Sequence, residues 1–461
     1  GWVMSSKFRK VKLKDITTFK YGKTIRKQDI QSYGEYPVFS GYQVVGYLPD
    51  YMYKEEQLII VCRGAGGTGD IKMSPSFCSI TNLAIIISCD ETVIDKGYLY
   101  WKLLFSDTYS LRTGSAQPQI TINSLESFEI EIETDVSRQR KIASELFDIN
   151  NKIRNNFVIN QILEQMAQAL FKSWFVDFEP VKEKIAVLEA GGSQEDATLA
   201  AMTAISGKDD DALVVFEHEH PEQYAVLKAT AELFPSAMQD SELGEIPMGW
   251  NVLPLESATS LIIDHRGKTP KKLGGDWSED GYPAISAKNI KNGRLVRHDA
   301  IKYVDAELYT KWMRNVLLSG DILMTSEAPL GELLYLAKNS NYLLSQRLYG
   351  IRADNNIVSG CYLYLWLQSA RVKDDINGRA TGSTVVGIRQ SELKKVNVMA
   401  PKKALIESFS SLAAYYLAKI ESNEKENIVL ENLRDTLLPK LLSGEITLPE
   451  AEQAVREVES V

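Results

Sequence analysis

The two halves of the chain carry apolar, alternating and helix-like segments in the same order. The paired strings are YPVFSG and YPAISA from Tyr36 and Tyr282, LIIV and ILMT from Leu58 and Ile322, and GYLYWKLL and GCYLYLWL from Gly97 and Gly360. The short apolar runs are typical of buried strands, and the longer aromatic runs are typical of helices. This internal similarity predicts two related mixed α/β units.

Another pair of segments follows the helix-like runs. TGSAQPQITINSLESFEI begins at Thr113, and TGSTVVGIRQSELKKVNV begins at Thr381. Both contain Thr-Gly-Ser, a short loop, a helical turn that begins with Ser, and an alternating strand. From Leu58 onward the matched strings begin 263 to 268 residues apart. The repeat therefore extends through each predicted unit.

Each half ends in a long predicted helix, over 138–175 and 405–442, with apolar residues at spacings of three and four. Adding 267 to the first apolar seam gives the second, and this shift places Asn156 on Asn423 and Asn160 on Asn427. A buried Asn costs stability but can fix register between paired helices. We expect an antiparallel pair in which these asparagines meet; the alternative is an amphipathic helix on a globular core.

These patterns predict an α+β fold with six parts. Two mixed α/β domains in a pseudo-two-fold arrangement are joined by two long helices that pack as an antiparallel coiled coil. The expected parts are the first domain over 4–137, the first helix over 138–180, an acidic linker over 181–248, the second domain over 249–404, the second helix over 405–446, and a tail over 447–461. A small helical piece within the linker is a further expectation.

The charge is distributed unevenly along the chain. The net charge is −9, but Glu183 to Glu245 holds 14 acidic and 3 basic residues, so the remainder is near neutral at +2. Lys7 to Lys27 holds nine Lys or Arg and one Asp, and a second basic cluster lies between Arg266 and Arg314. Such faces can bind phosphate, although a solvated charged surface gives the same pattern.

Motifs for catalysis and metal binding are weak or missing in the sequence. GAGGTG at Gly64 to Gly69 satisfies GxGxxG, but Pro75 interrupts the segment where a helix would follow, and a tight turn is the better interpretation. His218 and His220 have no third metal ligand at useful spacing, and the four cysteines form no CxxC pair. No apolar run approaches the ~20 residues of a membrane span, and no secretory signal is evident. We expect a cytoplasmic protein without catalytic chemistry or metal of its own.

Three strings are the most distinctive part of the sequence, two at the ends of the predicted long helices and one just before the second domain. They are ALFKSWFVDFEPVKEK from Ala169, SELGEIPMGW from Ser241 and LRDTLLPKLLSGEI from Leu433. Together with TGSAQPQIT and the tandem architecture, they resemble the specificity subunit of type I restriction-modification systems over nearly the whole chain. The resemblance implies a non-catalytic subunit with two target-recognition domains that read a bipartite, asymmetric double-stranded DNA target.

The same resemblance implies a set of partners and no cofactor in this chain. Two methyltransferase subunits would dock on the helices and supply S-adenosylmethionine binding and adenine methylation. Restriction subunits would supply motor and nuclease activity with ATP and Mg. The helices would set the gap between the two half-sites.

Candidate DNA contacts come from polar loops around the strand-like runs, where the two halves differ in sequence. Arg, Asn and Gln can bind base edges bidentately, whereas Lys more often holds phosphate. In the first domain they are Lys23, Arg26, Lys27, Tyr42, Gln43, Arg63 and Lys72. In the second domain they are Arg266, Lys268, Lys271, Lys272, Lys288, Asn289, Arg347 and Arg379.

Candidate partner contacts lie near the ends of the long helices. LFKSWFVDF presents more apolar surface than one helix seam can bury, so another chain is expected to cover part of it, unless the chain's own domains do so. The predicted partner-binding residues are Leu170, Phe171, Trp174, Phe175, Phe178, Leu437, Leu438 and Leu441.

Two other classes of protein stay open at this point. One is a methyltransferase or nuclease fused to a specificity module, against which the missing catalytic motifs count. The other is a coiled-coil scaffold without sequence-specific DNA binding, against which the paired domains count. Methylation by the chain alone, or equal binding to any DNA, would favour one of these alternatives.

Overall fold

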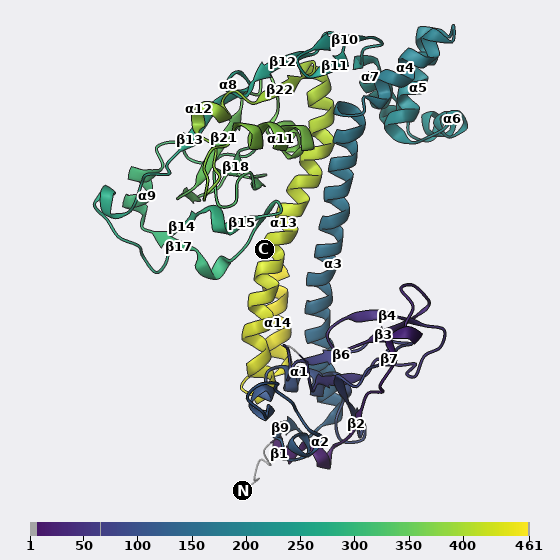
Figure 1. The fold of residues 1–461 in the computed structure, drawn as a ribbon, viewed down its shortest axis with the longest axis vertical. Helices are drawn as coiled ribbons and strands as arrows, with labels where there is room; N and C mark the ends of the chain where they lie inside the picture. Colours follow the sequence, from purple (N-terminus) through teal and green to yellow (C-terminus); the bar gives the residue numbers. More distant parts are fainter. Residues whose placement is uncertain (1–6, 65, 460–461) are drawn as a thin grey trace. The chain divides into compact units, whose positions relative to one another are not determined.

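A computed structural model of the chain describes residues 7–64 and 66–459 (Figure 1). The chain divides into two compact units, one formed by the residues up to Asn156 together with those from Lys425 onward, and one formed by Phe157–Glu424. The long helices α3 (Val136–Phe175) and α13 (Lys403–Ser443) contribute residues to both units. Each unit therefore contains one mixed α/β domain and part of both long helices.

The first domain is built on two small sheets and one strand pair. The strand orders are β2-β8-β5-β6 and β4-β3-β7, and β1 pairs with β9. All neighbours are antiparallel except β3 and β7. The strands are β1 (Phe8–Lys12), β2 (Thr17–Tyr21), β3 (Tyr36–Phe39), β4 (Val44–Leu48), β5 (Leu58–Val61), β6 (Ile71–Met73), β7 (Ser79–Ile80), β8 (Ala84–Cys89) and β9 (Glu129–Glu133).

The core of the first unit forms around β5, whose four apolar residues are all fully buried. Helix α1 (Lys96–Leu104) begins after Asp95, whose carboxylate accepts the backbone N–H of Tyr98 at 3.0 Å. This cap satisfies one of the free N–H groups of the first turn. Helix α2 is Ile122–Glu126, and the 3-10 helices are η1 (Leu13–Asp15), η2 (Lys27–Asp29) and η3 (Thr108–Leu111).

The C-terminal tail predicted over 447–461 contains a helix instead, α14 (Leu448–Glu459). Ala451 is buried in the core of the first unit, and Leu448 and Val455 pack against that core partly buried. The apolar spacing of this segment, i, i+3 and i+7, explains the helix. The tail is thus part of the first unit.

The second domain repeats the strand orders of the first, as β13-β21-β18-β19 and β17-β14-β20, with β12 paired to β22. Again one pair, β14 with β20, is parallel. The strands are β10 (Met238–Ser241), β11 (Gly244–Pro247), β12 (Asn251–Pro254), β13 (Thr259–Asp264), β14 (Tyr282–Ile285), β15 (Ile290–Lys291), β16 (Arg294–Leu295), β17 (Lys302–Val304), β18 (Ile322–Thr325), β19 (Leu333–Tyr335), β20 (Leu343–Leu344), β21 (Leu348–Ala353) and β22 (Asn397–Ala400). The sequence repeat is therefore a structural repeat.

The register of the paired strands shows which residues of the two domains are equivalent. Ile60 pairs with Ile85 in the first domain, and Met324 pairs with Tyr349 in the second, so equivalent residues of these strands differ by 264. The helices are α8 (Leu255–Ala258), α9 (Ala306–Trp312), α10 (Gly360–Gln368), α11 (Ala370–Arg379) and α12 (Gln390–Leu393), and the 3-10 helices are η4 (Lys271–Leu273), η5 (Ala287–Asn289) and η6 (His298–Ala300).

The two long helices pack antiparallel within each unit, as Figure 1 shows. In the first unit the amide of Asn156 donates to Asn427 Oδ1 at 2.9 Å, and in the second the amide of Asn423 donates to Asn160 Oδ1 at 2.8 Å. All four side chains are at most 7% exposed. Two mixed domains and two long antiparallel helices confirm the predicted fold class.

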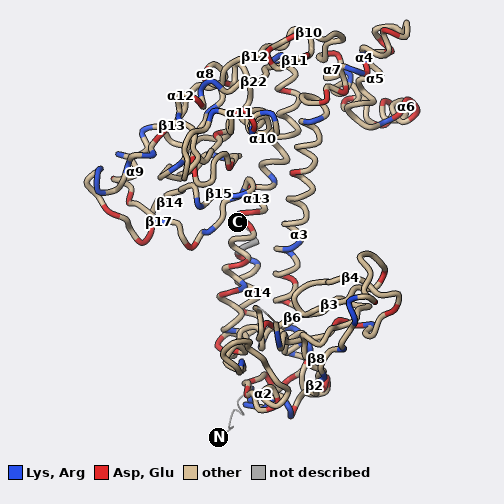
Figure 2. The backbone as a smooth tube through the Cα atoms, in the orientation of Figure 1, with Lys and Arg blue, Asp and Glu red and all other residues tan. Residues whose placement is uncertain are grey.

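The segment predicted as an acidic linker is folded. It forms α4 (Glu179–Glu189), α5 (Gln194–Ser206), α6 (Asp210–Glu219) and α7 (Pro221–Leu233). Met202, Leu213 and Ala231 are buried in a small core of their own. The side chains of Ser193 and Asp209 cap α5 and α6. We name α4 to α7 the acidic helices, and Figure 2 shows acidic positions along α6.

Candidate nucleic-acid interface

A cavity of about 530 Å³ lies in the second domain, at the ends of β14 and β20. We name it the basic cavity, since the charged side chains in its lining are Lys271, Lys288, Lys302, Arg347 and one acid, Asp276. The Lys302 ammonium lies 5.3 Å from the centre of the Trp277 ring, a cation–π contact in the same lining. This excess of positive charge suits a polyanion such as the phosphate backbone of DNA.

Gln346 and Arg347 lie side by side in the lining, and both side chains are exposed. Arg347 has φ of +62°, a left-handed conformation that is uncommon for a residue with a side chain. Its carbonyl accepts the N–H of Ser326 at 2.8 Å, and the carbonyl of Gln346 accepts the N–H of Ala287 at 3.3 Å. These bonds hold the backbone of the two residues against neighbouring segments.

Three of the predicted second-domain residues, Lys271, Lys288 and Arg347, line the basic cavity together. Arg266 is bound elsewhere: its guanidinium donates to both oxygens of Asp264, at 2.8 and 2.9 Å, and lies 4.4 Å from the centre of the Tyr349 ring. The bonds to Asp264 raise the pKa of Arg266. This guanidinium is therefore committed to its own domain.

Two other predicted lysines donate to backbone carbonyls. Lys268 Nζ donates to the carbonyl of Trp312 at 3.0 Å, and burial lowers the pKa of Lys268. Lys272 Nζ donates to the carbonyl of Gly267 at 2.9 Å. Both side chains stabilise the loop that precedes η4.

The structure places Asn289 and Arg379 in contacts within their own domain. Asn289 is fully buried; its side-chain oxygen accepts the N–H of Ser286, and its amide donates to Val296 and Arg297 carbonyls. Arg379 Nε donates to Asp375 at 2.7 Å, and a terminal nitrogen lies 3.6 Å from Glu392. The first side chain cannot reach a ligand, and the second already has acidic partners.

In the first domain the structure brings Tyr42 and Arg63 together. The Tyr42 hydroxyl donates to the carbonyl of Arg63 at 3.1 Å, and the Arg63 guanidinium lies 5.8 Å from the centre of the Tyr21 ring. Strand β2 ends at Tyr21, and Gly22 follows it. Gly22 lies so close to Thr81 that a Cβ atom on Gly22 would be only 1.9 Å from the carbonyl oxygen of Thr81. Gly22 therefore lets Lys23 enter a bridge with Thr81, near the same end of the sheet.

The remaining first-domain candidates are more dispersed. Arg26 Nε donates to Asp29 at 2.9 Å, and Lys27 begins η2. Gln43 closes a turn, with its backbone N–H donating to the Ser40 hydroxyl at 3.2 Å. Lys72 lies on the edge strand β6, paired with Ile59. Among residues 7–64 and 66–459, no hydrogen bond or ion pair joins Lys72 to the other six candidates.

Several lining residues were missed from the sequence. Gln346, Lys302, Ser286 and Trp277 belong to the basic cavity although they come from four separate segments. One signal was present: Gln346 directly precedes the candidate Arg347, and Asn82 holds its equivalent position in the first domain. An amide at the same place in both repeats points to a shared role.

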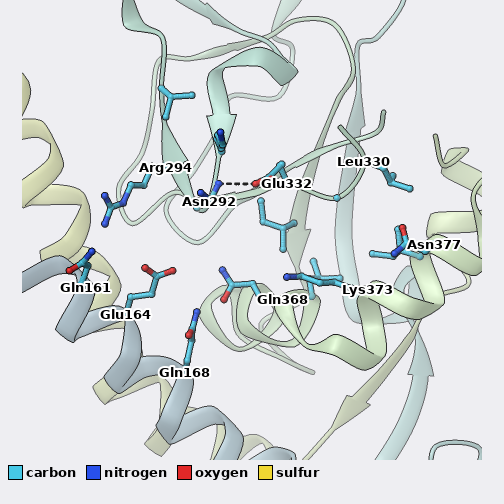
Figure 3. A pocket seen from close by; sticks show the side chains of 17 residues that line it. Gln161, Glu164, Gln168, Asn292, Arg294, Leu330, Glu332, Gln368, Lys373 and Asn377 are labelled. Carbon is cyan, nitrogen blue, oxygen red and sulfur yellow. Dashed lines mark hydrogen bonds between the residues drawn. The ribbon is translucent and has the colours of Figure 1, made fainter. Parts of the chain in front are cut away.

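A second cavity, of about 700 Å³, lies between α3 and the second domain within the same unit. Figure 3 shows Gln161, Glu164 and Gln168 of α3 opposite Asn292 and Arg294. Its lining contains three basic and two acidic side chains, and Glu332 accepts the N–H of Asn292 at 2.8 Å. Because these charges nearly balance, the basic cavity is the better candidate for binding phosphate.

The predicted partner-binding residues are mostly covered by the chain itself. Phe171, Trp174 and Phe175 are buried in the core of the second unit, and Leu170 and Phe178 pack against it partly buried. Leu437, Leu438 and Leu441 are buried in the core of the first unit. Packing against the chain's own domains thus accounts for the apolar surface of LFKSWFVDF.

A different apolar surface is exposed on α3. Val158, Ile159, Ile162 and Met166 are between 42% and 50% exposed. Their spacing of three, four and seven or eight residues places them on one side of the helix. We name these four residues the α3 stripe.

The described ranges contain no cluster of three or more His, Cys, Asp or Glu side chains that could hold a metal ion. Within the same ranges, no helix is both long and apolar enough to span a membrane. His218 and His220 lie at the end of α6 and directly after it.

Comparisons with known proteins agree with these features. The family model "Type I restriction modification DNA specificity domain" matches residues 5–165 and 247–432. The HindI specificity subunit of Haemophilus influenzae is 34% identical over 378 residues, covering 78% of this chain and 80% of that protein. The MjaIX specificity subunit of Methanocaldococcus jannaschii is 22% identical, with 79% and 72% covered. The crystal structure of a type I S subunit from M. genitalium shares the fold, with a TM-score of 0.62, 14% identity, and 96% and 98% covered.

Proposed function

Because the chain belongs to the type I restriction-modification specificity family, a family of non-catalytic DNA-recognition subunits, we propose that it reads a bipartite, asymmetric target. Each domain reads one half-site of double-stranded DNA, and the long helices fix the gap between them. The chain recruits two methyltransferase subunits and the restriction subunits, which bring S-adenosylmethionine, ATP and Mg. The complex acts in the cytoplasm on adenines of its target.

The difference between the two domains at equivalent positions carries this proposal. Arg63, Asn82 and Leu83 of the first domain correspond to Glu327, Gln346 and Arg347 of the second, by the strand register of the two sheets. Charge and hydrogen-bonding capacity change from Arg63 to Glu327 and from Leu83 to Arg347, while the amide at Asn82 and Gln346 and the paired helix asparagines are kept. Two domains with different side chains around the same framework would read two different half-sites.

The DNA contacts are proposed in two sets. In the second domain, Arg347 contacts bases, while Lys271 and Lys288 hold phosphate at the basic cavity. In the first domain, the set is Lys23, Arg26, Lys27, Tyr42, Gln43, Arg63 and Lys72. The local charge of the basic cavity supports binding despite the net charge of −9.

The α3 stripe is proposed as a docking surface for a methyltransferase subunit. Four apolar side chains side by side on an exposed helix face favour burial against another protein. We propose the α3 stripe as the docking surface in place of Trp174 and its neighbours, because the chain's own core already buries those side chains.

The decisive experiment maps methylated adenines in cells that carry the assembled system, with and without this chain. A chain-dependent motif in two parts with a fixed gap is expected. A contiguous motif would contradict the two-domain reading. Equal binding of the complex to target and random duplexes would instead favour a scaffold.

A further inference from the structure

We propose that Arg347 reads a guanine and Gln346 a neighbouring adenine in the half-site of the second domain, with Glu327 positioning Arg347. This inference rests on the proposed function, and it assigns particular bases to particular side chains. It begins from two adjacent exposed side chains that line one basic cavity.

The backbone explains why both side chains reach the cavity. Along a regular strand, consecutive side chains point to opposite faces. Leu344 and Leu348 are fully buried on either side of the pair, whereas Gln346 and Arg347 are both exposed. The left-handed backbone of Arg347 interrupts the alternation between β20 and β21. Such a conformation is unfavourable for a non-glycine residue, and conformations of this kind occur often at binding sites.

Glu327 leaves the outer end of the Arg347 guanidinium available. Arg347 Nε lies 3.3 Å from Glu327 Oε1, and the arginine side chain is 49% exposed. With Nε held, the two terminal nitrogens still form a pair of donors. Such a pair matches the N7 and O6 acceptors of guanine in the major groove. Arg266 differs, because Asp264 already occupies two of its nitrogens.

The side-chain amide of Gln346 is similarly available. It makes no hydrogen bond to any residue that the structure describes, although its backbone carbonyl is held by Ala287. A primary amide can donate to N7 and accept from the N6 amino group of adenine. Lys271, Lys288 and Lys302 around the pair supply charge for the flanking phosphates.

The first domain lacks this combination. Leu83 takes the place of Arg347, and Arg63 takes the place of Glu327, where it lies against Tyr21. At these equivalent positions, an arginine held by a carboxylate therefore occurs in the second domain and not in the first. Guanine recognition at this place in the fold is expected in the second half-site only.

The test measures binding of the assembled complex, containing the full chain, to duplexes with each base at each position of the second half-site. The unaltered complex is expected to prefer guanine at one position by about 10- to 100-fold. Arg347→Ala should abolish that preference and leave the first half-site unchanged. Arg347→Gly should do the same, and it relieves the left-handed backbone, so that misfolding cannot explain the loss.

Three further variants make the assignment specific. Arg347→Lys keeps the charge but loses the paired donors, so discrimination should fall while the salt dependence is retained. Gln346→Ala should relax an adjacent adenine position. Glu327→Gln should weaken the guanine preference several-fold without changing the preferred base. Lys311→Ala, an exposed change on α9 outside the cavity, is the matched control.

A second half-site without guanine would overturn the inference. So would an Arg347→Ala complex that binds every duplex more weakly but keeps its base preference, since that pattern indicates a phosphate contact. If the unaltered complex shows no two-part preference at all, the proposed function itself fails, which is a separate and recognisable result.

Discussion

At the scale of single residues, local partners decide which basic side chains are free for DNA. Arg266 and Arg379 resemble Arg347 in the sequence, yet Asp264 binds two nitrogens of Arg266 and Asp375 binds Arg379 at 2.7 Å, whereas Glu327 lies 3.3 Å from one nitrogen of Arg347. Asp264 and Asp375 lie two and four positions before their arginines, so these ion pairs could have been predicted from the sequence. The burial of Asn289 could not have been predicted, because it depends on how the turn after β14 folds back on residues 296 and 297.

The paired asparagines give a prediction on stability. Asn160→Ala should lower the free energy of unfolding by about 1–3 kcal/mol, since the buried amide of Asn423 loses its acceptor. Replacing both Asn160 and Asn423 with Leu should recover much of that loss, because neither of the two buried amides is then left without the other. Urea unfolding of the single and double variants, with the exposed Gln161→Ala as control, measures this. If the losses of stability caused by single substitutions of Asn160 and Asn423 simply added up in the double variant, a direct pairing of the two side chains would be contradicted.

His265 gives a prediction on pH. Burial, with a smaller effect of Lys268, lowers the pKa of His265 to about 4. Between pH about 6.5 and 4 the unfolded chain binds a proton that the folded chain does not, so this residue lowers stability as pH falls through that window. The side chain is only half-buried, so we expect the loss of stability to stay below the ~3 kcal/mol that corresponds to the whole pKa shift.

His265→Gln should therefore flatten the pH dependence of the unfolding midpoint in that window. Thermal unfolding at a series of pH values checks this, with His298→Gln, an exposed change in the same domain, as control. Equal slopes for the His265 variant and the unaltered chain would show that this imidazole is not responsible.

At the scale of elements, the helices with the longest apolar pattern were predicted best. The helices predicted over 138–175 and 405–442 are found as Val136–Phe175 and Lys403–Ser443, because many turns of one apolar seam leave little ambiguity. The acidic helices were predicted as a linker with one small helical piece, since each helix is short and the many charges hide a small core. The basic cavity could not be predicted, because its lining joins loops far apart in the sequence.

The α3 stripe gives a prediction on assembly. Ile162→Asp together with Met166→Asp should reduce recovery of the methyltransferase with the tagged chain at least tenfold, because a charge would be buried in the contact. The fold should be kept, since both side chains are exposed. Co-purification tests this, with Gln161→Asp as the matched control on the same helix. Full recovery with the double variant would remove the stripe from the interface.

At the scale of the whole molecule, the repeat predicted the two domains, and the uneven charge predicted basic faces that can bind phosphate. The acidic segment lies in one unit with the basic cavity. Its negative charge repels phosphate in a way that does not depend on base sequence. We therefore expect it to favour release of the chain from unrelated DNA.

This charge distribution gives a prediction on specificity. Changing Asp209, Asp210 and Asp211 to Asn should raise binding to unrelated duplex a few-fold at low salt, and the difference should disappear at high salt, where charges are screened. Asn also caps helices, so α6 should remain intact. Binding isotherms at several salt concentrations measure the effect, with the charge-preserving Glu triple variant as control. Unchanged non-specific binding at low salt would rule out the repulsion.

The asparagine pairs also bear on the ancestry of the chain. A shift of 267 positions places Asn156 on Asn423 and Asn160 on Asn427, so the donor–acceptor pair Asn156–Asn427 corresponds to the pair Asn423–Asn160. The two contacts are therefore copies of one contact with the two helices exchanged. Two identical half-length polypeptides would satisfy the same amides between them. We infer that a gene for a half-length chain was duplicated and fused, after which each half could diverge alone.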